Sequence, residues 1–158
     1  NTLLEQLCDQ SSDTKTTTIS ITDQKSITHP ADENAYNGVG SNAEIRFNPN
    51  ENPSLITQNE ISKQVQQEGR PAYIGLAHEL IHGMHINSGA ARPKTIKLQS
   101  ITTINGEKYL ETLPLEEAIT VGLHGVTSKG PTENKIRREH NLNIHQIFLN
   151  YEGHFNLL

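Results

Sequence analysis

The chain has 158 residues and a formal net charge of −5, with 33% apolar residues, one cysteine and no tryptophan. This length suits a single domain over residues 1–158 with a modest core, in which we expect residues 1–13 to be irregular. The acidic balance makes nucleic acid a poor partner, the lone Cys8 excludes an internal disulfide, and no apolar run is long enough to span a bilayer.

The N-terminal half predicts strands joined by polar connections. Residues 15–22 alternate polar and apolar side chains with a period of two, the pattern of a half-buried strand, and residues 25–28 are expected to pair with them. Residues 42–48 alternate in the same way, so they form either a purely structural strand or one that binds an extended peptide at its edge. Residues 49–53 and the glutamine-rich residues 57–69 predict loops or weakly helical connections.

The middle of the chain predicts a buried helix over residues 71–86. Pro71 stands at its start, where a missing N–H costs nothing, and residues 87–89 contain the glycine that closes its far end. A solvated helix would carry charges at residues 75–77, but these are small or apolar. We therefore expect this helix to be packed inside the molecule.

The sequence His78-Glu79-Leu80-Ile81-His82 lies inside this helix and is its most informative feature. One turn separates the two histidines, so both rings point the same way and can bind one zinc ion. Glu79 can then reach a water on the metal without being a ligand itself. The alternative is a chance pentapeptide in a helix with several histidines. We expect instead one Zn²⁺ per chain, with His78 and His82 as ligands and Glu79 as the general base.

A catalytic zinc ion usually takes three protein ligands and leaves a fourth position for water, so a further ligand is needed. Ser88 occupies the position where one class of zinc peptidase has a third histidine, and every aspartate precedes the motif. The third ligand is then a glutamate or another histidine. Residues 114–123 predict a second helix, on which Glu116 and Glu117 are both candidates. The apolar pattern of that helix does not separate the two.

Residues 95–104 and 107–113 flank Asn105-Gly106, the strongest short signal for a β-hairpin. This hairpin would join the two predicted metal-bearing helices.

Several other polar residues have weaker signals. His85 lies seven residues after His78, on roughly the same face of the helix, so it is either a hydrogen-bonding partner of the site or a packed residue, and we favour packing. Asn134 either caps a helix that starts at Lys135 or holds a loop near the site. The remaining histidines have no ligand spacing, and we expect them on the surface or in loops: His29, His124, His145 and His154.

The run His-Glu-Leu-Ile-His-Gly-Met-His, followed by Glu-Glu-Ala-Ile-Thr-Val-Gly, resembles the zinc site of clostridial neurotoxin light chains. In those enzymes the second glutamate of the pair binds zinc. The resemblance therefore implies that Glu117 is the third ligand and that Glu116 is a nearby carboxylate that orients the site.

A resemblance to the NleD-type zinc metalloprotease effectors covers more of the chain, residues 38–142. It rests on Gly-Ser-Asn-Ala-Glu-Ile, the zinc helix, the glutamate pair, and Thr-Glu-Asn-Lys-Ile-Arg-Arg-Glu-His, in that order. Bacteria inject these effectors through type III secretion systems. The resemblance implies a virulence effector in the host cytoplasm that cuts host MAP kinases in the activation loop. It also implies an N-terminal secretion region, which we expect to precede Asn1.

Hydrolysis of a peptide builds negative charge on the carbonyl oxygen, which a fixed cation can stabilise. By analogy with a downstream arginine of the neurotoxin light chains, Arg137 is the candidate, and the alternative is a surface charge on a helix. Those enzymes have a tyrosine three residues after the arginine, where this chain has His140. The second donor is therefore His140, Tyr151 or none.

These observations predict an α+β, single-domain, zincin-like metalloprotease with a small mixed sheet, an active-site helix and a second ligand-bearing helix. We expect a monomeric zinc endopeptidase of the glutamate-zincin type, with no nucleic-acid or membrane partner. Two alternatives are a toxin-type zinc protease with other targets and a non-catalytic metal-binding module that engages a host protein. Glu79 argues against the second, because binding alone needs no base.

Overall fold

The computed structural model describes residues 15–102 and 108–148. The elements in this part of the chain are, in order, β1 (Thr17–Ile21), β2 (Ile27–Pro30), the short 3-10 helix η1 (Glu33–Tyr36), β3 (Ala43–Phe47), β4 (Ser54–Gln58), β5 (Val65–Gly69), α2 (Ala72–Asn87), β6 (Thr95–Thr102), β7 (Lys108–Pro114), α3 (Leu115–Val121), α4 (Glu133–Glu139) and β8 (Ile144–Phe148). The fold class is α+β, as predicted. None of the described helices has the length and apolarity needed to cross a membrane.

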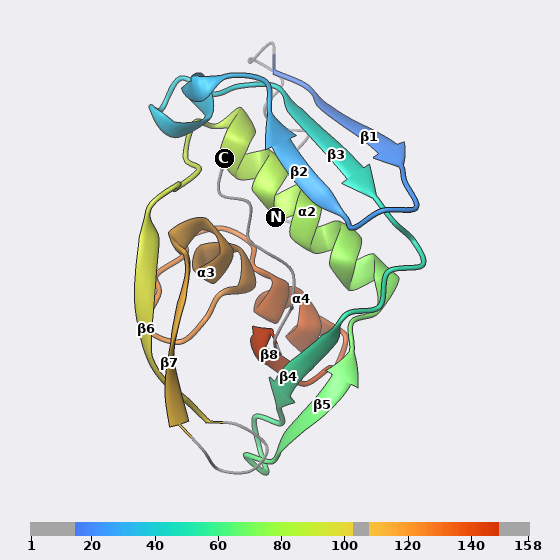
Figure 1. The fold of residues 1–158 in the computed structure, drawn as a ribbon, viewed down its shortest axis with the longest axis vertical. Coiled ribbons are helices and arrows are strands. Elements are labelled where there is room, and N and C mark those ends of the chain that lie inside the picture. Colours follow the sequence, from blue (N-terminus) through green and yellow to red (C-terminus); the bar gives the residue numbers. More distant parts are fainter. Residues whose placement is uncertain (1–14, 103–107, 149–158) are drawn as a thin grey trace.

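Helix α2 crosses the middle of the molecule, with the sheet of β1, β3 and β2 on one side and helices α3 and α4 on the other (Figure 1). It begins after Pro71 and ends at Asn87, within one residue of the predicted bounds. Apolar residues on different faces of the helix, among them Ile74, Ile81 and Ile86, are buried. A helix that buries so much of its circumference has to lie between two layers, and this places its histidines inside the fold.

The first sheet is mixed and has the order β1-β3-β2, with β1 parallel and β2 antiparallel to β3. Alternate residues of β3 are buried, which confirms the predicted strand. Two expectations are wrong. The segment that becomes β2 pairs with β3 and not with β1, and β1 is largely exposed, with Ile21 at 71% exposure. Because β3 has a partner on both edges, it cannot bind an extended peptide by edge pairing. Among the described strands of this sheet, β1 and β2 have the free edges.

The second sheet is antiparallel and has the order β5-β4-β8. The prediction of loop or weak helix for residues 57–69 is wrong, because the end of β4 and all of β5 lie in this segment. The side chains of β5 are mainly polar and none is buried, so no apolar alternation marks the strand. Residues 65–69 form a strand because they pair with β4, whose residues Leu55 and Ile56 are buried.

The predicted hairpin is confirmed by the antiparallel pairing of β6 with β7, and its Asn105-Gly106 turn lies outside the described residues. Strand β7 runs directly into α3, the predicted second helix. Gly122 ends α3 with a φ of 75°, and a side chain there would meet Thr132 at the start of α4. This glycine therefore allows the chain to turn tightly beside the entry to α4, and both helices then pack against α2.

A candidate metal centre on the central helix

His78, His82 and Glu117 bring three possible metal donors together from α2 and α3. The two Nε2 atoms of the histidines are 3.1 Å apart. The carboxylate of Glu117 reaches both rings, with 3.3 Å from Oε2 to His78 Nε2 and 3.0 Å from Oε1 to His82 Nε2. Both histidines are buried, at 3% and 8% exposure. The helical spacing of His78 and His82 thus brings two donors together, and the packing of α3 on α2 adds the third.

The donor set fits zinc in both its chemistry and its spacing. Zinc accepts imidazole nitrogen and carboxylate oxygen, and ligands about 2.0–2.2 Å from a tetrahedral ion lie roughly 3.3 Å from one another. The observed separations of 3.0–3.3 Å are close to this value. Three protein donors would leave one position for water, as in catalytic sites.

The other ring nitrogen of each histidine meets a carboxylate. His78 Nδ1 lies 2.9 Å from Oε2 of Glu133, and His82 Nδ1 lies 3.2 Å from Oε1 of Glu116. A carboxylate can only accept a hydrogen bond here, so Nδ1 must carry the hydrogen. These contacts therefore favour the Nδ1–H tautomer, which leaves the lone pair of Nε2 for a metal. The two glutamates therefore orient the rings and raise their basicity.

The charges around the two imidazoles oppose the effect of their burial. Burial alone would lower the pKa of His78, but hydrogen bonds from its imidazole to Glu117 and Glu133 raise it above the ordinary value. Burial also acts to lower the pKa of His82. The charge of Glu117 and the hydrogen bond to Glu116 overcome this effect and raise the pKa well above its ordinary value. An incoming metal ion must then displace protons from these rings, so its binding depends on pH.

Glu116 connects the candidate metal donors to α2 and to the segment that follows it. Besides His82, its Oε1 meets His85 Nδ1 at 2.6 Å, and its Oε2 accepts from the backbone N–H of Arg92 at 2.8 Å. Thr120 Oγ1, one turn along α3, lies 3.3 Å from His82 Nδ1. The expectation that Glu116 is a nearby orienting carboxylate agrees with this geometry. His85 is buried and is a hydrogen-bonding partner of the site, so the favoured prediction of packing alone is wrong.

Glu133 forms a second and deeper group of contacts. Its side chain is fully buried, and its Oε1 accepts from Arg137 Nε at 2.7 Å and contacts His145 Nδ1 at 3.1 Å. Burial would raise the pKa of Glu133, but the charge and hydrogen bond of His145, with the hydrogen bond of His78, hold it well below the ordinary value. The carboxylate therefore stays charged and serves three basic side chains from α2, α4 and β8.

Arg137 and His140, the two residues predicted to stabilise the oxyanion, lie in different surroundings. Arg137 is fully buried, and its guanidinium is bound by Glu133 and by the carbonyl of Asn143, with Nη1 to O at 3.2 Å. His140 is exposed at the end of α4, and its ring centre lies 5.1 Å from that of Tyr73. The observed contacts thus link Arg137 to His78 through Glu133 and link His140 to the start of α2.

Glu79, the predicted general base, follows the candidate donor His78 in α2 and is buried, at 6% exposure. Its Oε2 accepts from Thr28 Oγ1 at 2.7 Å, and Oε1 makes no hydrogen bond with the described residues. The charge of Glu79 also acts on the imidazole of His82. One oxygen of the carboxylate is therefore held while the other is available for a proton.

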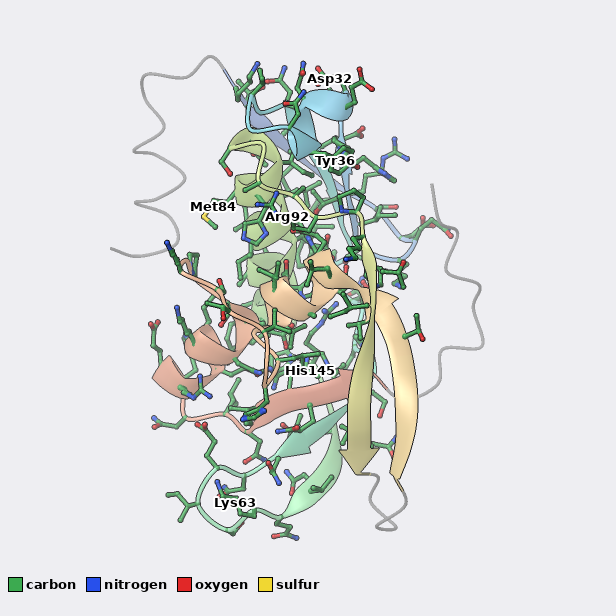
Figure 2. All side chains as sticks on the ribbon, turned by 90° about the vertical axis from the view of Figure 1, so that its left-hand side faces the viewer. Asp32, Tyr36, Lys63, Met84, Arg92 and His145 are labelled. Carbon is green, nitrogen blue, oxygen red and sulfur yellow. The ribbon has the colours of Figure 1, made fainter. Side chains whose placement is uncertain are left out.

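Sequence reasoning missed Glu133, His145 and Thr28. The prediction of a surface or loop position for His145 is wrong, because this residue of β8 is 1% exposed and lies in the interior of the molecule (Figure 2). Glu133 and Arg137 stand four residues apart, the spacing of a helical ion pair, and this signal could have found both. No local pattern points to Thr28.

Of the two roles considered for Asn134, the capping of its helix is wrong and the holding of a neighbouring segment is confirmed. Thr132 is the cap, and its Oγ1 accepts from the backbone N–H of Lys135 at 3.2 Å. The side chain of Asn134 instead donates to the carbonyls of Gly122 and His145 and accepts from the His145 N–H at 2.7 Å. Asn134 therefore holds the connection between α3 and β8 beside Glu133, which was the alternative.

Comparisons with known proteins assign the chain to a family. No curated protein sequence matches the chain. Among solved structures it is similar to the light-chain protease of botulinum neurotoxin serotype C1, with 20% identity and a TM-score of 0.47, over 78% of this chain and 31% of that one. The zinc-free botulinum neurotoxin type C light chain gives 19% identity and the same TM-score, with 78% and 30% covered. This chain thus spans less than a third of the length of those light chains. The profile of the family Peptidase M91, described as effector protein, matches residues 1–147, so the chain belongs to the M91 peptidase family of effector proteins.

Proposed function

We propose that the protein is a zinc-dependent endopeptidase of the glutamate-zincin type that binds one Zn²⁺ through His78, His82 and Glu117. The observation that carries the proposal is the convergence of these three donors beside Glu79, whose Oε1 is available for a proton. A zinc ion held there supplies Lewis-acid chemistry, polarising the peptide carbonyl and lowering the pKa of a water. A metal-binding module that cuts nothing would have no use for the base.

Other steps of peptide hydrolysis are carried out by side chains of the protein. Glu79 takes the proton of the attacking water at Oε1 and delivers it to the nitrogen of the leaving amine. Glu116 and Glu133 keep the two imidazoles oriented through their Nδ1 atoms. The assignment of Arg137 to the oxyanion rests on the resemblance to the neurotoxin light chains, and so does that of His140. Both stay predictions, because the observed contacts of Arg137 are with other residues of the fold, namely Glu133, Glu68 and Asn143.

The substrate approaches along β2 in this proposal. Strand β2 has a free edge among the described strands of its sheet and carries Thr28, which touches Glu79. An extended segment of substrate that pairs with this edge would pass in front of the base. In this proposal β2, and not residues 42–48, binds the extended substrate at its edge.

We place the substrate among host signalling proteins and propose stress-activated MAP kinases, cut in the activation loop. The description of the family as effector proteins supports a host target, and the resemblance to NleD-type effectors supplies the kinases. Type III injection into the host cytoplasm and action as a monomer belong to the same proposal. A toxin-type protease with the same centre would differ only in its targets.

The test is zinc content and cleavage of purified stress-activated MAP kinases by the wild type, by Glu79→Ala and by a control, Glu139→Ala, whose glutamate is exposed at the end of α4. We expect one equivalent of zinc in all three proteins and loss of cutting only in Glu79→Ala. Zinc without cleavage of the kinases would overturn the proposed substrate, and digestion of other host proteins would then identify the target. Absence of zinc from the wild type would overturn the metal centre itself.

A further inference from the structure

The hydroxyl of Thr28 contacts the carboxylate of Glu79 across the boundary between the sheet and α2. Thr28 Oγ1 lies 2.7 Å from Glu79 Oε2 and 3.2 Å from the backbone carbonyl oxygen of the same residue. A hydroxyl has one hydrogen, and the shorter contact to a charged oxygen is the stronger use of it. The base is thus held by a residue 51 positions away in the chain.

The backbone of Thr28 is fixed at this position by the sheet. Thr28 stands opposite Ile45 in the antiparallel pairing of β2 with β3, so the two side chains lie on the same face, and Ile45 is fully buried. Just before β2, the backbone N–H of Ser26 donates to Glu51 Oε2 at 2.7 Å, and Ser26 Oγ accepts from the N–H of Asn48 at 3.0 Å. A β-branched threonine also has few side-chain rotamers. The hydroxyl therefore reaches Glu79 from a rigid support.

We infer that Thr28 is a positioning residue for Glu79. Its hydroxyl binds Oε2 and so aims Oε1 at the metal centre. The inference rests on the proposed function, because it gives Glu79 the role of base. Without the hydroxyl, no hydrogen bond from the described residues holds the carboxylate, so it can turn. Thr28 has no hydrogen bond to the three metal donors, so its loss should change the chemical step and leave metal binding intact.

The contact itself is tested without any cleavage, by a double-mutant cycle on the zinc-free protein. The urea midpoint of unfolding is measured for the wild type, Thr28→Val, Glu79→Ala and the double variant. We expect Thr28→Val to lower the midpoint in the wild-type background and to have a clearly smaller effect when Glu79 is already alanine. Equal shifts in the two backgrounds would overturn the inference, whatever the protein cuts.

Thr57→Val is the matched control for this cycle. Thr57 is also a threonine on a strand, and its buried hydroxyl has no hydrogen-bond partner among the described residues. The same substitution there removes a hydroxyl of the same kind without removing a contact to Glu79. We expect its shift in midpoint to be the same in both backgrounds.

The positioning role is tested with the zinc-loaded protein and a stress-activated MAP kinase as substrate. We expect Thr28→Val to lower kcat roughly tenfold, the value of a hydrogen bond to a charged group, with KM and zinc content unchanged. Thr28→Ser keeps the hydroxyl and should restore most of kcat. An unchanged kcat in Thr28→Val, or a kcat in Thr28→Ser as low as in Thr28→Val, would overturn the role.

Failure of the inference and failure of the proposed function can be told apart. If the wild type cuts no kinase, the proposed substrate fails, while the unfolding cycle still decides whether Thr28 holds Glu79. If Thr28→Val does not fold, Thr28→Ala takes its place in the cycle and Thr28→Ser in the kinetics. A folded Thr28→Ser protein with one equivalent of zinc and a strongly reduced kcat would then contradict the inference.

Discussion

Oε2 of Glu133 on α4 lies 2.9 Å from Nδ1 of His78 on α2, although the two residues are 55 positions apart in the chain. Both side chains are buried, and the other oxygen of Glu133 is occupied by Arg137 and His145. Helix α4 therefore contributes to the candidate metal centre without supplying a donor atom. Its Glu133 fixes the ring of His78, a candidate donor on α2.

Replacement of this carboxylate should weaken the metal centre. We expect Glu133→Gln to lower zinc affinity about 10- to 100-fold, since a neutral amide polarises the imidazole of His78 less than a carboxylate does. Competition with a chromophoric chelator measures the affinity. The control is Glu139→Gln, at the exposed end of the same helix, which should bind zinc like the wild type. Equal affinities for both variants would mean that Glu133 serves the fold alone.

Arg137 and Arg138 are neighbours with opposite surroundings, and their removal should have very different effects. Arg137→Met leaves the buried charge of Glu133 without its arginine, which should cost about 3–5 kcal/mol of unfolding free energy. Arg138 forms an exposed ion pair with Glu60, so Arg138→Met should cost less than about 1 kcal/mol. Urea unfolding of the zinc-free proteins gives both values.

The same pair of variants decides the role of Arg137 in the reaction. If Arg137→Met keeps the stability and zinc affinity of the wild type and loses only cleavage, the arginine acts on the oxyanion, as the sequence comparison suggested. If stability and zinc affinity fall together, its contact with Glu133 accounts for its importance.

The two adjacent glutamates of α3 should differ in their effect on zinc. Glu117 reaches the Nε2 atoms of both histidines, so Glu117→Gln should not retain one equivalent of zinc after dialysis. Glu116 contacts the Nδ1 atom of His82, so Glu116→Gln should retain the equivalent with lower affinity. Metal analysis of the dialysed proteins checks both. The reverse result would make Glu116 the ligand.

The stability of the zinc-free protein should depend on Glu116 in acid. Burial acts to raise the pKa of Glu116, but hydrogen bonds from His82 and His85 overcome it and lower the pKa to about 2. A carboxyl group whose pKa is lower in the folded state stabilises the fold above its ordinary value of 4.5, and this contribution is lost as the pH falls toward 2. The difference in unfolding free energy between the wild type and Glu116→Gln should therefore narrow as the pH falls below 4.5.

Urea unfolding of the two zinc-free proteins at several pH values from about 5.5 down to 3 measures this difference, in a range where free imidazole is already protonated. A gap of constant size across the range would show that the two histidines do not hold the Glu116 carboxylate in its charged form.

Features that depend on neighbours along the chain follow from local sequence patterns. The spacing of His78 and His82 places two rings on one side of any helix, because the helical pitch is fixed. Pro71 and Gly122 mark ends of helices through their own backbone preferences, and Asn105-Gly106 predicts a hairpin that β6 and β7 form. These predictions needed no knowledge of the rest of the fold.

Contacts between distant segments depend instead on how the whole chain packs. The order β1-β3-β2, the strand formed by polar residues 65–69, and the burial of His145 depend on which surfaces pack together, and no local pattern encodes that. Glu116 and Glu117 look alike in the sequence, but packing of α3 on α2 turns one carboxylate to the Nε2 atoms and the other to Nδ1. A carboxylate orients a ring or binds a metal according to its position within a few ångströms, and the packed core fixes positions on that scale.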